Sequence, residues 1–147
     1  MTAQRPVDAK PMVFRRATAR GTLKVRPATA RAIRLGRVQK GDPLRTGELA
    51  GLLAMKRTPE LIPHCHPVPL TGSRVEARVE GNGVVVEGTA EAVYRTGVEM
   101  EALTGVAVAL LTVWDMVKYL EKNAAGNYPT ARLTGLRVVR KEKHDPP

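Results

Sequence analysis

The chain from Thr96 to Asn123 reads Thr-Gly-Val-Glu-Met-Glu-Ala-Leu-Thr-Gly-Val-Ala-Val-Ala-Leu-Leu-Thr-Val-Trp-Asp-Met-Val-Lys-Tyr-Leu-Glu-Lys-Asn. This stretch predicts one long helix with an almost wholly apolar middle and charged residues near both ends. A helix that is apolar on nearly every side has to be buried in a core or a subunit interface. Ionisable residues on such a helix need partners or a chemical task. We therefore expect the fold and the functional site to be organised around this helix.

The first end of this helix carries two carboxylates. Thr96 and Glu99 fit a capping box, in which the threonine caps the helix and the glutamate reaches back to it. That structural explanation does not cover Glu101. On an ideal helix Glu99 and Glu101 lie about 200° apart, so both can face one site only if the helix begins late.

The far end carries Asp115 and Lys118, which share a face because they are three residues apart. A plain surface salt bridge is one interpretation. Because the pair follows an apolar run, we expect partial burial and pKa values tuned for acid–base work. Glu101 and Asp115 are roughly 40° from a common face but about 21 Å apart along the axis. Only an antiparallel second copy could bring them to one small ligand, which indicates an oligomer with an interface site.

The remaining sequence predicts a single α+β domain with an open, mainly antiparallel sheet and helices on one face. Residues 1–13 are expected to form a flexible arm, residues 14–140 the domain, and residues 141–147 a polar, frayed tail. The expected elements are a strand over 17–25, helices over 27–36 and 43–57, a hairpin turning at 81–83 with its second strand ending near 94, and a last strand over 133–139.

The helix expected from Pro43 has a distinct start, because Asp42 is a good N-cap and proline suits the first helical position. Three leucines in it are spaced to face the core, and two glycines are explained if another backbone packs closely against them. These residues are Leu49, Leu52, Leu53, Gly47 and Gly51.

The segment Pro63-His64-Cys65-His66-Pro67 is expected to be extended, since each proline disfavours helical geometry in the residue before it. His64 and His66 would then project to one side and Cys65 to the other. Adjacent ligands on a strand diverge, and the only other histidine, His144, lies in the tail, so we expect no metal site. A structural turn and a substrate-facing histidine remain as alternatives.

Composition limits the class of protein. The 24 Lys and Arg exceed the 14 Asp and Glu and leave a formal charge of +10, which favours nucleic acid, anionic lipid or a phosphorylated metabolite as partner. One Phe, one Trp and three Tyr argue against RNA binding by base stacking. A single cysteine excludes an intrachain disulfide. With no signal peptide and no apolar run of membrane-spanning length, we expect a soluble cytoplasmic protein.

Several ordered motifs resemble the molybdenum-cofactor biosynthesis C (MoaC) family, the cyclic pyranopterin monophosphate synthases. The resemblance is specific from about residue 40 to 118 and weaker to about 139. The motifs are Lys40-Gly41-Asp42, Ala50-Gly51 with Lys56-Arg57-Thr58, Glu60-Leu61-Ile62-Pro63-x-Cys65-His66-Pro67, Thr96 to Thr104, and Asp115-Met116-x-Lys118.

The resemblance implies a ferredoxin-like subunit assembled as a hexamer, a trimer of dimers, with sites at the dimer interface. It implies a substrate that is a cyclised dihydroguanosine triphosphate, made from GTP. The product would be cyclic pyranopterin monophosphate, with release of pyrophosphate. No resident cofactor is expected, and Mg²⁺ would bind only together with the triphosphate. Neither a membrane nor nucleic acid is an expected partner.

By position, the resemblance implies proton transfer by Asp115 and Lys118, while Lys40 serves the triphosphate or the rearrangement. It also implies substrate contacts, some of them from the other subunit of a dimer. The residues expected to make them are His64, Cys65, His66, Glu99, Met100, Glu101 and Arg15.

The chain departs from the family pattern in three places. The amino-terminal segment before Arg15 is shortened, His64 stands where leucine is usual, and 141–144 replaces a glycine-rich tail. These departures keep one alternative open, a diverged non-catalytic paralogue or a basic nucleotide- or nucleic-acid-binding protein. Retention of all the motif residues argues against it.

Overall fold

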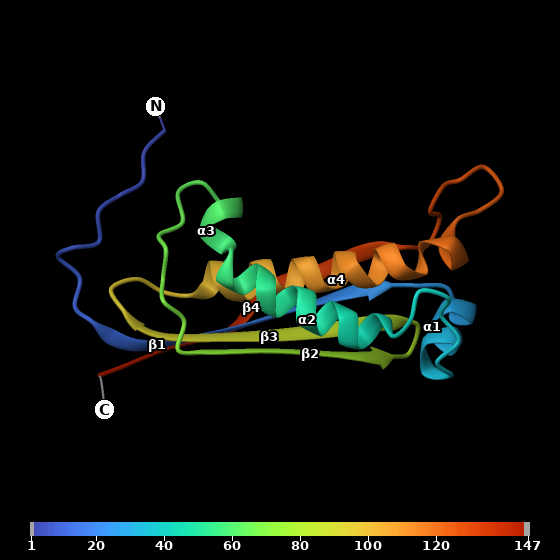
Figure 1. The fold of residues 1–147 in the computed structure, drawn as a ribbon, viewed down its shortest axis with the longest axis horizontal. Coiled ribbons are helices and arrows are strands. Elements are labelled where there is room, and N and C mark those ends of the chain that lie inside the picture. Colours follow the sequence, from blue (N-terminus) through green and yellow to red (C-terminus); the bar gives the residue numbers. More distant parts are fainter. Residues whose placement is uncertain (1, 146–147) are drawn as a thin grey trace.

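The computed structural model describes residues 2–145 and contains four strands and four helices (Figure 1). In chain order these are β1 (Val13–Lys24), α1 (Pro27–Arg34), α2 (Pro43–Lys56), α3 (Thr58–Leu61), β2 (Gly72–Glu80), β3 (Gly83–Tyr94), α4 (Glu99–Glu121) and β4 (Arg132–His144). Asp42 caps α2 by accepting hydrogen bonds from the backbone N–H groups of Leu44 and Arg45. The helix start predicted from Asp42 and Pro43 is thus confirmed.

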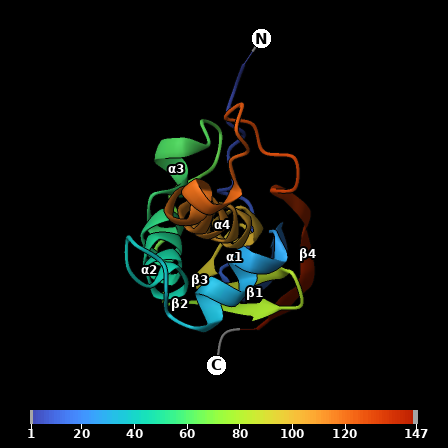
Figure 2. The same cartoon turned by 90° about the vertical axis from the view of Figure 1, so that its right-hand side faces the viewer.

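The strands form one antiparallel sheet in the order β2-β3-β1-β4. This order and the alternation of strands and helices are those of a ferredoxin-like α+β fold in a single domain, as predicted. Helices α2 and α4 lie side by side on one face of the sheet, and the other face is open (Figures 1 and 2). The hairpin turn lies at Gly81, whose φ of 55° favours glycine.

Helix α4 is the core helix. Its side facing the sheet is fully buried, and Ala102, Val106, Ala109, Leu110, Val113 and Val117 form that side. Small residues on the strands allow the helix to approach the sheet closely: a Cβ on Gly21 would lie 2.9 Å from Leu110 Cδ1. Within residues 2–145, α4 alone is long and apolar enough to cross a membrane, but half of its most apolar window is buried inside the protein.

Helices α2 and α4 touch through their backbones. A Cβ added to Gly51 would lie 2.8 Å from the Gly105 carbonyl oxygen, and one added to Gly47 would lie 3.1 Å from the Ala109 carbonyl oxygen. The close packing predicted from the two glycines is therefore confirmed.

The same contact overturns the prediction for the leucines of α2. Leu49 is 61% exposed and Leu53 47% exposed, and only Leu52 packs partly against the core. The helix presents its glycine side to α4, together with Ala54 and Met55, so the leucines at neighbouring positions turn outwards.

Two terminal and loop predictions also need correction. Residues 141–144, expected in a frayed tail, continue β4 and pair with β1 from Phe14 to Ala17; Pro146 and Pro147 lie outside the described residues. The segment at 63–67 is not extended throughout, because Cys65 N–H bonds to the Ile62 carbonyl and closes a turn after the short helix α3.

The open face of the sheet carries ion pairs, some between neighbouring strands and some within one strand. Arg16 bonds to Glu91 and Glu142 at 3.0 and 2.7 Å, and Arg78 pairs with Glu80 and Glu87 at 2.7 and 3.3 Å. Arg20, Arg74, Arg140 and Glu76 complete a set of five arginines and five glutamates. These ten side chains balance one another in charge, while the strand register places Lys24, Arg132 and Arg137 on the same face.

We predict that Gly51→Ala lowers the free energy of unfolding by about 2 kcal/mol. Overpacking against the Gly105 carbonyl destabilises the fold by about 3 kcal/mol, whereas the higher helix propensity of alanine stabilises it by about 1 kcal/mol. Denaturant unfolding measures the change. Arg45→Ala, at an exposed position of α2, is the control and should stay within about 0.5 kcal/mol of wild type. A Gly51→Ala protein as stable as wild type would contradict the backbone contact.

Candidate active site

Three of the predicted site residues meet at the far end of α4. Asp115 and Lys118 come from the helix, and Lys40 comes from the loop between α1 and α2. Lys118 Nζ lies 3.0 Å from Asp115 Oδ1, and Lys40 Nζ lies 3.4 Å from Asp115 Oδ2 and 3.3 Å from the Asp115 carbonyl oxygen. The salt bridge predicted for the helical pair is confirmed, and the fold adds the second ammonium group to it.

The two lysines set the charge of this cluster. Hydrogen bonds from Lys118 and then from Lys40 lower the pKa of Asp115, and Asp115 in turn raises the pKa of Lys118. These shifts keep Asp115 ionised and Lys118 protonated near neutral pH. Such a cluster presents both a proton acceptor and a proton donor to one ligand, with positive charge for a phosphate.

The partial burial predicted for Asp115 and Lys118 is wrong for the single chain. Their side chains are 59% and 42% exposed. The apolar run before them is buried against the sheet, whereas these two positions lie on the side of α4 that faces away from it.

A second cluster lies at the first end of α4, around Cys65 and Glu101. Cys65 Sγ–H donates to Glu101 Oε2 at 3.6 Å, and Glu101 is only 1% exposed. Burial raises the pKa of Glu101. Burial, with the Glu101 carboxylate as the next cause, raises the pKa of Cys65 to about 11. This end therefore favours protonated groups, in contrast to the ionised cluster at Asp115.

Glu99 belongs to the same end, but the predicted capping box does not form. The N-cap is Val98, no side chain caps the helix, and α4 begins at Glu99 itself. Because α4 already includes Glu99, both glutamates are helical and the condition for their facing one site is not met; the charge of Glu99 still contributes to the raised pKa of Glu101. Among the described residues, Glu99 Oε2 and Glu101 Oε1 are buried without a hydrogen-bond partner.

The other predicted contact residues are placed around this end with different surroundings. His64 is exposed, and Met100 is 38% exposed on α4. His66 is half-buried, and its Nε2 bonds to the Arg5 carbonyl of the amino-terminal arm. Arg15 is buried and donates to the carbonyl oxygens of Tyr94 and Arg95 at 3.1 and 3.4 Å, so it fastens the end of β3.

The part of the chain from 2 to 145 places no group of three His, Cys, Asp or Glu side chains where a metal ion could be held. Two residues that the sequence did not single out do join the clusters. Lys141 Nζ lies 3.4 Å from Glu99 Oε1, and Tyr119 Oη accepts a hydrogen bond from the backbone N–H of Gln39, next to Lys40. Lys141 was assigned to a tail because every residue from 140 to 144 is charged or histidine, which hides the strand pattern.

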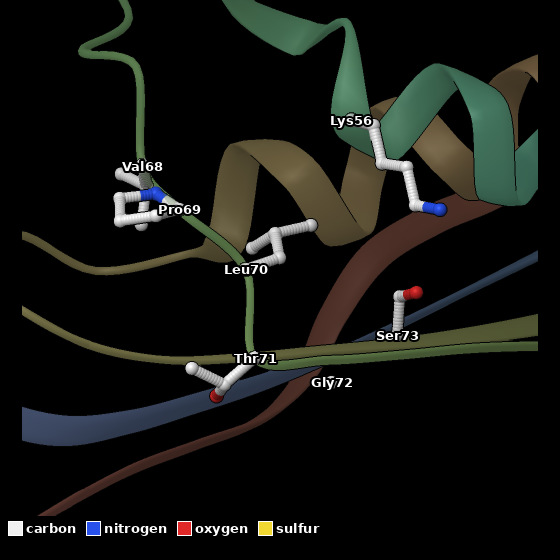
Figure 3. Close-up of a pocket in the computed structure, with 7 residues that line it drawn as sticks. All are labelled: Lys56, Val68, Pro69, Leu70, Thr71, Gly72 and Ser73. Carbon is white, nitrogen blue, oxygen red and sulfur yellow. The ribbon is translucent and has the colours of Figure 1, made fainter.

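A separate surface cavity of about 460 Å³ lies where α2 ends above the start of β2. Figure 3 shows the amino group of Lys56 above the hydroxyl of Ser73, with Leu70 to the left of both. The lining consists of Lys56 and residues 68–73, so neither cluster on α4 opens into this cavity.

We predict that Glu101→Gln speeds alkylation of Cys65 by iodoacetamide. Removing the carboxylate lowers the pKa of the thiol from about 11 towards its ordinary value, so more thiolate is present at mildly alkaline pH. Since Cys65 is the only cysteine, intact mass reports its alkylation directly, and the midpoint of the rate against pH should fall. Glu60→Gln, an exposed change on the nearby α3, is the control. The same midpoint in Glu101→Gln and wild type would refute the contact.

Comparison with known proteins finds a match to a family described as the MoaC family over residues 5–144. A Pyrococcus abyssi protein named "Probable cyclic pyranopterin monophosphate synthase" is 54% identical over 139 residues, covering 93% of this chain and 86% of its own. A Thermococcus kodakarensis protein of the same name is 51% identical, with 93% and 88% covered. A Methanothermobacter thermautotrophicus protein, named as a probable accessory protein of the synthase, is 47% identical, with 93% and 86% covered.

Proposed function

The chain belongs to the MoaC family, and from this membership we propose that it is a cyclic pyranopterin monophosphate synthase of molybdenum cofactor biosynthesis. The proposed reaction converts a cyclised dihydroguanosine triphosphate, made from GTP, to cyclic pyranopterin monophosphate with loss of pyrophosphate. The enzyme would act in the cytoplasm, where reducing conditions suit its single free cysteine.

The observation that carries this proposal is the contact of Asp115 with both Lys40 and Lys118. Lys40 lies 75 residues before Asp115 in the chain, and the fold brings them together. A rearrangement that opens and closes rings must move protons between carbon, nitrogen and oxygen atoms. In the single chain the ion pair lowers the pKa of Asp115 and raises that of Lys118, which holds both groups charged. We assign proton acceptance to Asp115 and proton donation to Lys118 once a bound substrate separates the pair.

Lys40 supplies a second positive charge on the opposite oxygen of Asp115. We propose that Lys40 binds a phosphate oxygen of the substrate. An ammonium group binds phosphate strongly and can neutralise the charge of the departing pyrophosphate. Mg²⁺ is usually held by one or two carboxylates together with the phosphates of a substrate, so here it would enter only with the triphosphate.

The complete site is proposed to lie between two subunits. The two clusters are about 21 Å apart on one helix, too far for one small substrate. An antiparallel second copy of α4 would place its Glu101 end against the Asp115 end of the first. Apolar side chains left exposed on α2 and α4 support this arrangement, because a dimer would bury them; they are Leu49, Leu53, Met100 and Leu111. Three such dimers would form the hexamer expected for the family.

The charge distribution weighs against a nucleic-acid-binding protein. Five arginines on the open sheet face are each paired with a glutamate, so these side chains are not free to contact a phosphate backbone. A non-catalytic paralogue would have no need to keep Lys40, Asp115 and Lys118 in contact.

We predict that Asp115→Asn and Lys118→Ala each lower turnover at least about 100-fold, because each removes one partner of the proton-transfer pair. The assay supplies GTP and the upstream radical enzyme and measures the fluorescent oxidised pterin. Size-exclusion chromatography should show the wild-type assembly in both variants. If wild type forms no product under conditions where a known synthase does, the proposed function fails; near-normal turnover in either variant refutes the roles.

We further predict that mixing two inactive variants restores activity. Each proposed interface site takes Asp115 from one subunit and Glu101 from the other. In a dimer of one Asp115→Asn and one Glu101→Gln subunit, one site therefore carries both substitutions and the other site carries neither. Unfolding and refolding the two together should recover about a quarter of wild-type turnover, since random pairing makes half of the dimers mixed. Each variant refolded alone is the control. No recovery, with mixed oligomers verified by mass spectrometry, would place the whole site within one subunit.

A further inference from the structure

The loop that carries Lys40 is well fixed at its two ends. After α1 the backbone turns at Gly36, where φ is 67°, and Arg37 N–H bonds to the Ala32 carbonyl. At the other end Asp42 caps α2. Between these points Val38 is buried, whereas Gln39 and Lys40 are exposed.

Apart from Val38, which packs into the core, the middle of this loop is exposed. A cavity of about 530 Å³ lies along its other side, lined by residues of α1, the loop and the start of α2. Within residues 2–145, a single hydrogen bond ties the loop backbone to α4: Gln39 N–H donates to Tyr119 Oη at 2.8 Å. The residue next to this bond is Lys40, whose Nζ reaches Asp115.

The same end of α4 also holds the start of α1. The buried Glu121 carboxylate accepts from the backbone N–H of Arg26 at 3.0 Å and from the hydroxyl of Thr29. Helix α1 has no side-chain cap of its own, so Glu121 supplies one from another element. The segment from Arg26 to Gln39 is thus pinned to α4 at both ends, by Glu121 and by Tyr119.

We infer that Tyr119 is a positioning residue for the active site: its hydroxyl holds the loop so that Lys40 lies beside Asp115. Tyr119 follows Asp115 by one helical turn, so the hydroxyl fixes the loop at the level along α4 from which Lys40 reaches Asp115 Oδ2. The effect of Tyr119 on turnover rests on the proposed function, while its hold on the loop does not.

The variant Tyr119→Phe removes the hydroxyl and keeps the ring. Hydrogen exchange followed by mass spectrometry should show amides of residues 37–41 exchanging about three- to ten-fold faster than in wild type, the effect of one net hydrogen bond. Tyr94→Phe is the matched control, because the Tyr94 hydroxyl makes no hydrogen bond within residues 2–145. Unchanged exchange of 37–41 in Tyr119→Phe would overturn the inference.

Turnover separates positioning of Lys40 from a general loss of stability. In the wild-type background Tyr119→Phe should lower kcat about three- to ten-fold, whereas in the Lys40→Ala background it should lower the residual rate no further. Equal losses in both backgrounds would overturn the inference, because Tyr119 would then act independently of Lys40. If wild type makes no product, the proposed function fails, and faster exchange in Tyr119→Phe still supports the hold on the loop.

Discussion

The close contact between α2 and α4 is the constraint on which the rest of the structure depends. At Gly51 there is no room for a methyl group against the Gly105 carbonyl, so the two helices touch through their backbones. This pairing sets how α4 crosses the sheet and which side of α2 faces outwards. The ionisable residues of α4 lie beyond this contact, towards the two ends of the helix.

The two ends differ in the protonation state that their surroundings favour. At Asp115 the neighbouring ammonium groups stabilise the carboxylate in a solvent-exposed position. At Glu101 burial and the nearby Glu99 carboxylate raise the pKa and favour the neutral acid, and they outweigh the opposite effect of the hydrogen bond from Cys65. One helix thus provides two chemical environments about 21 Å apart, which is useful only if a ligand meets both from different subunits.

Much of the fold could be predicted from the sequence because its signals are local. The Asp42 cap, the hairpin at Gly81 and the apolar run of α4 each depend on neighbouring residues. The errors arose where tertiary contacts determine the structure. The leucine spacing on α2 predicted a core-facing side, but the glycine side of α2 packs against α4 instead. Thr96 had the right spacing for a capping box, but the helix begins at Glu99, three residues after it. The contacts of Lys40 with Asp115 and of Gln39 with Tyr119 join residues 75 and 80 positions apart in the chain, which no local pattern encodes.

The paired arginines and glutamates on the open face of the sheet have a consequence for how ligands arrive. Since the ten charges in those ion pairs cancel one another, the net positive charge of the chain comes from residues outside them, including Lys40 and Lys118. A polyphosphate diffusing nearby is attracted by this excess of positive charge. Capture of a charged ligand would then be fastest at low ionic strength and slower as salt screens the attraction.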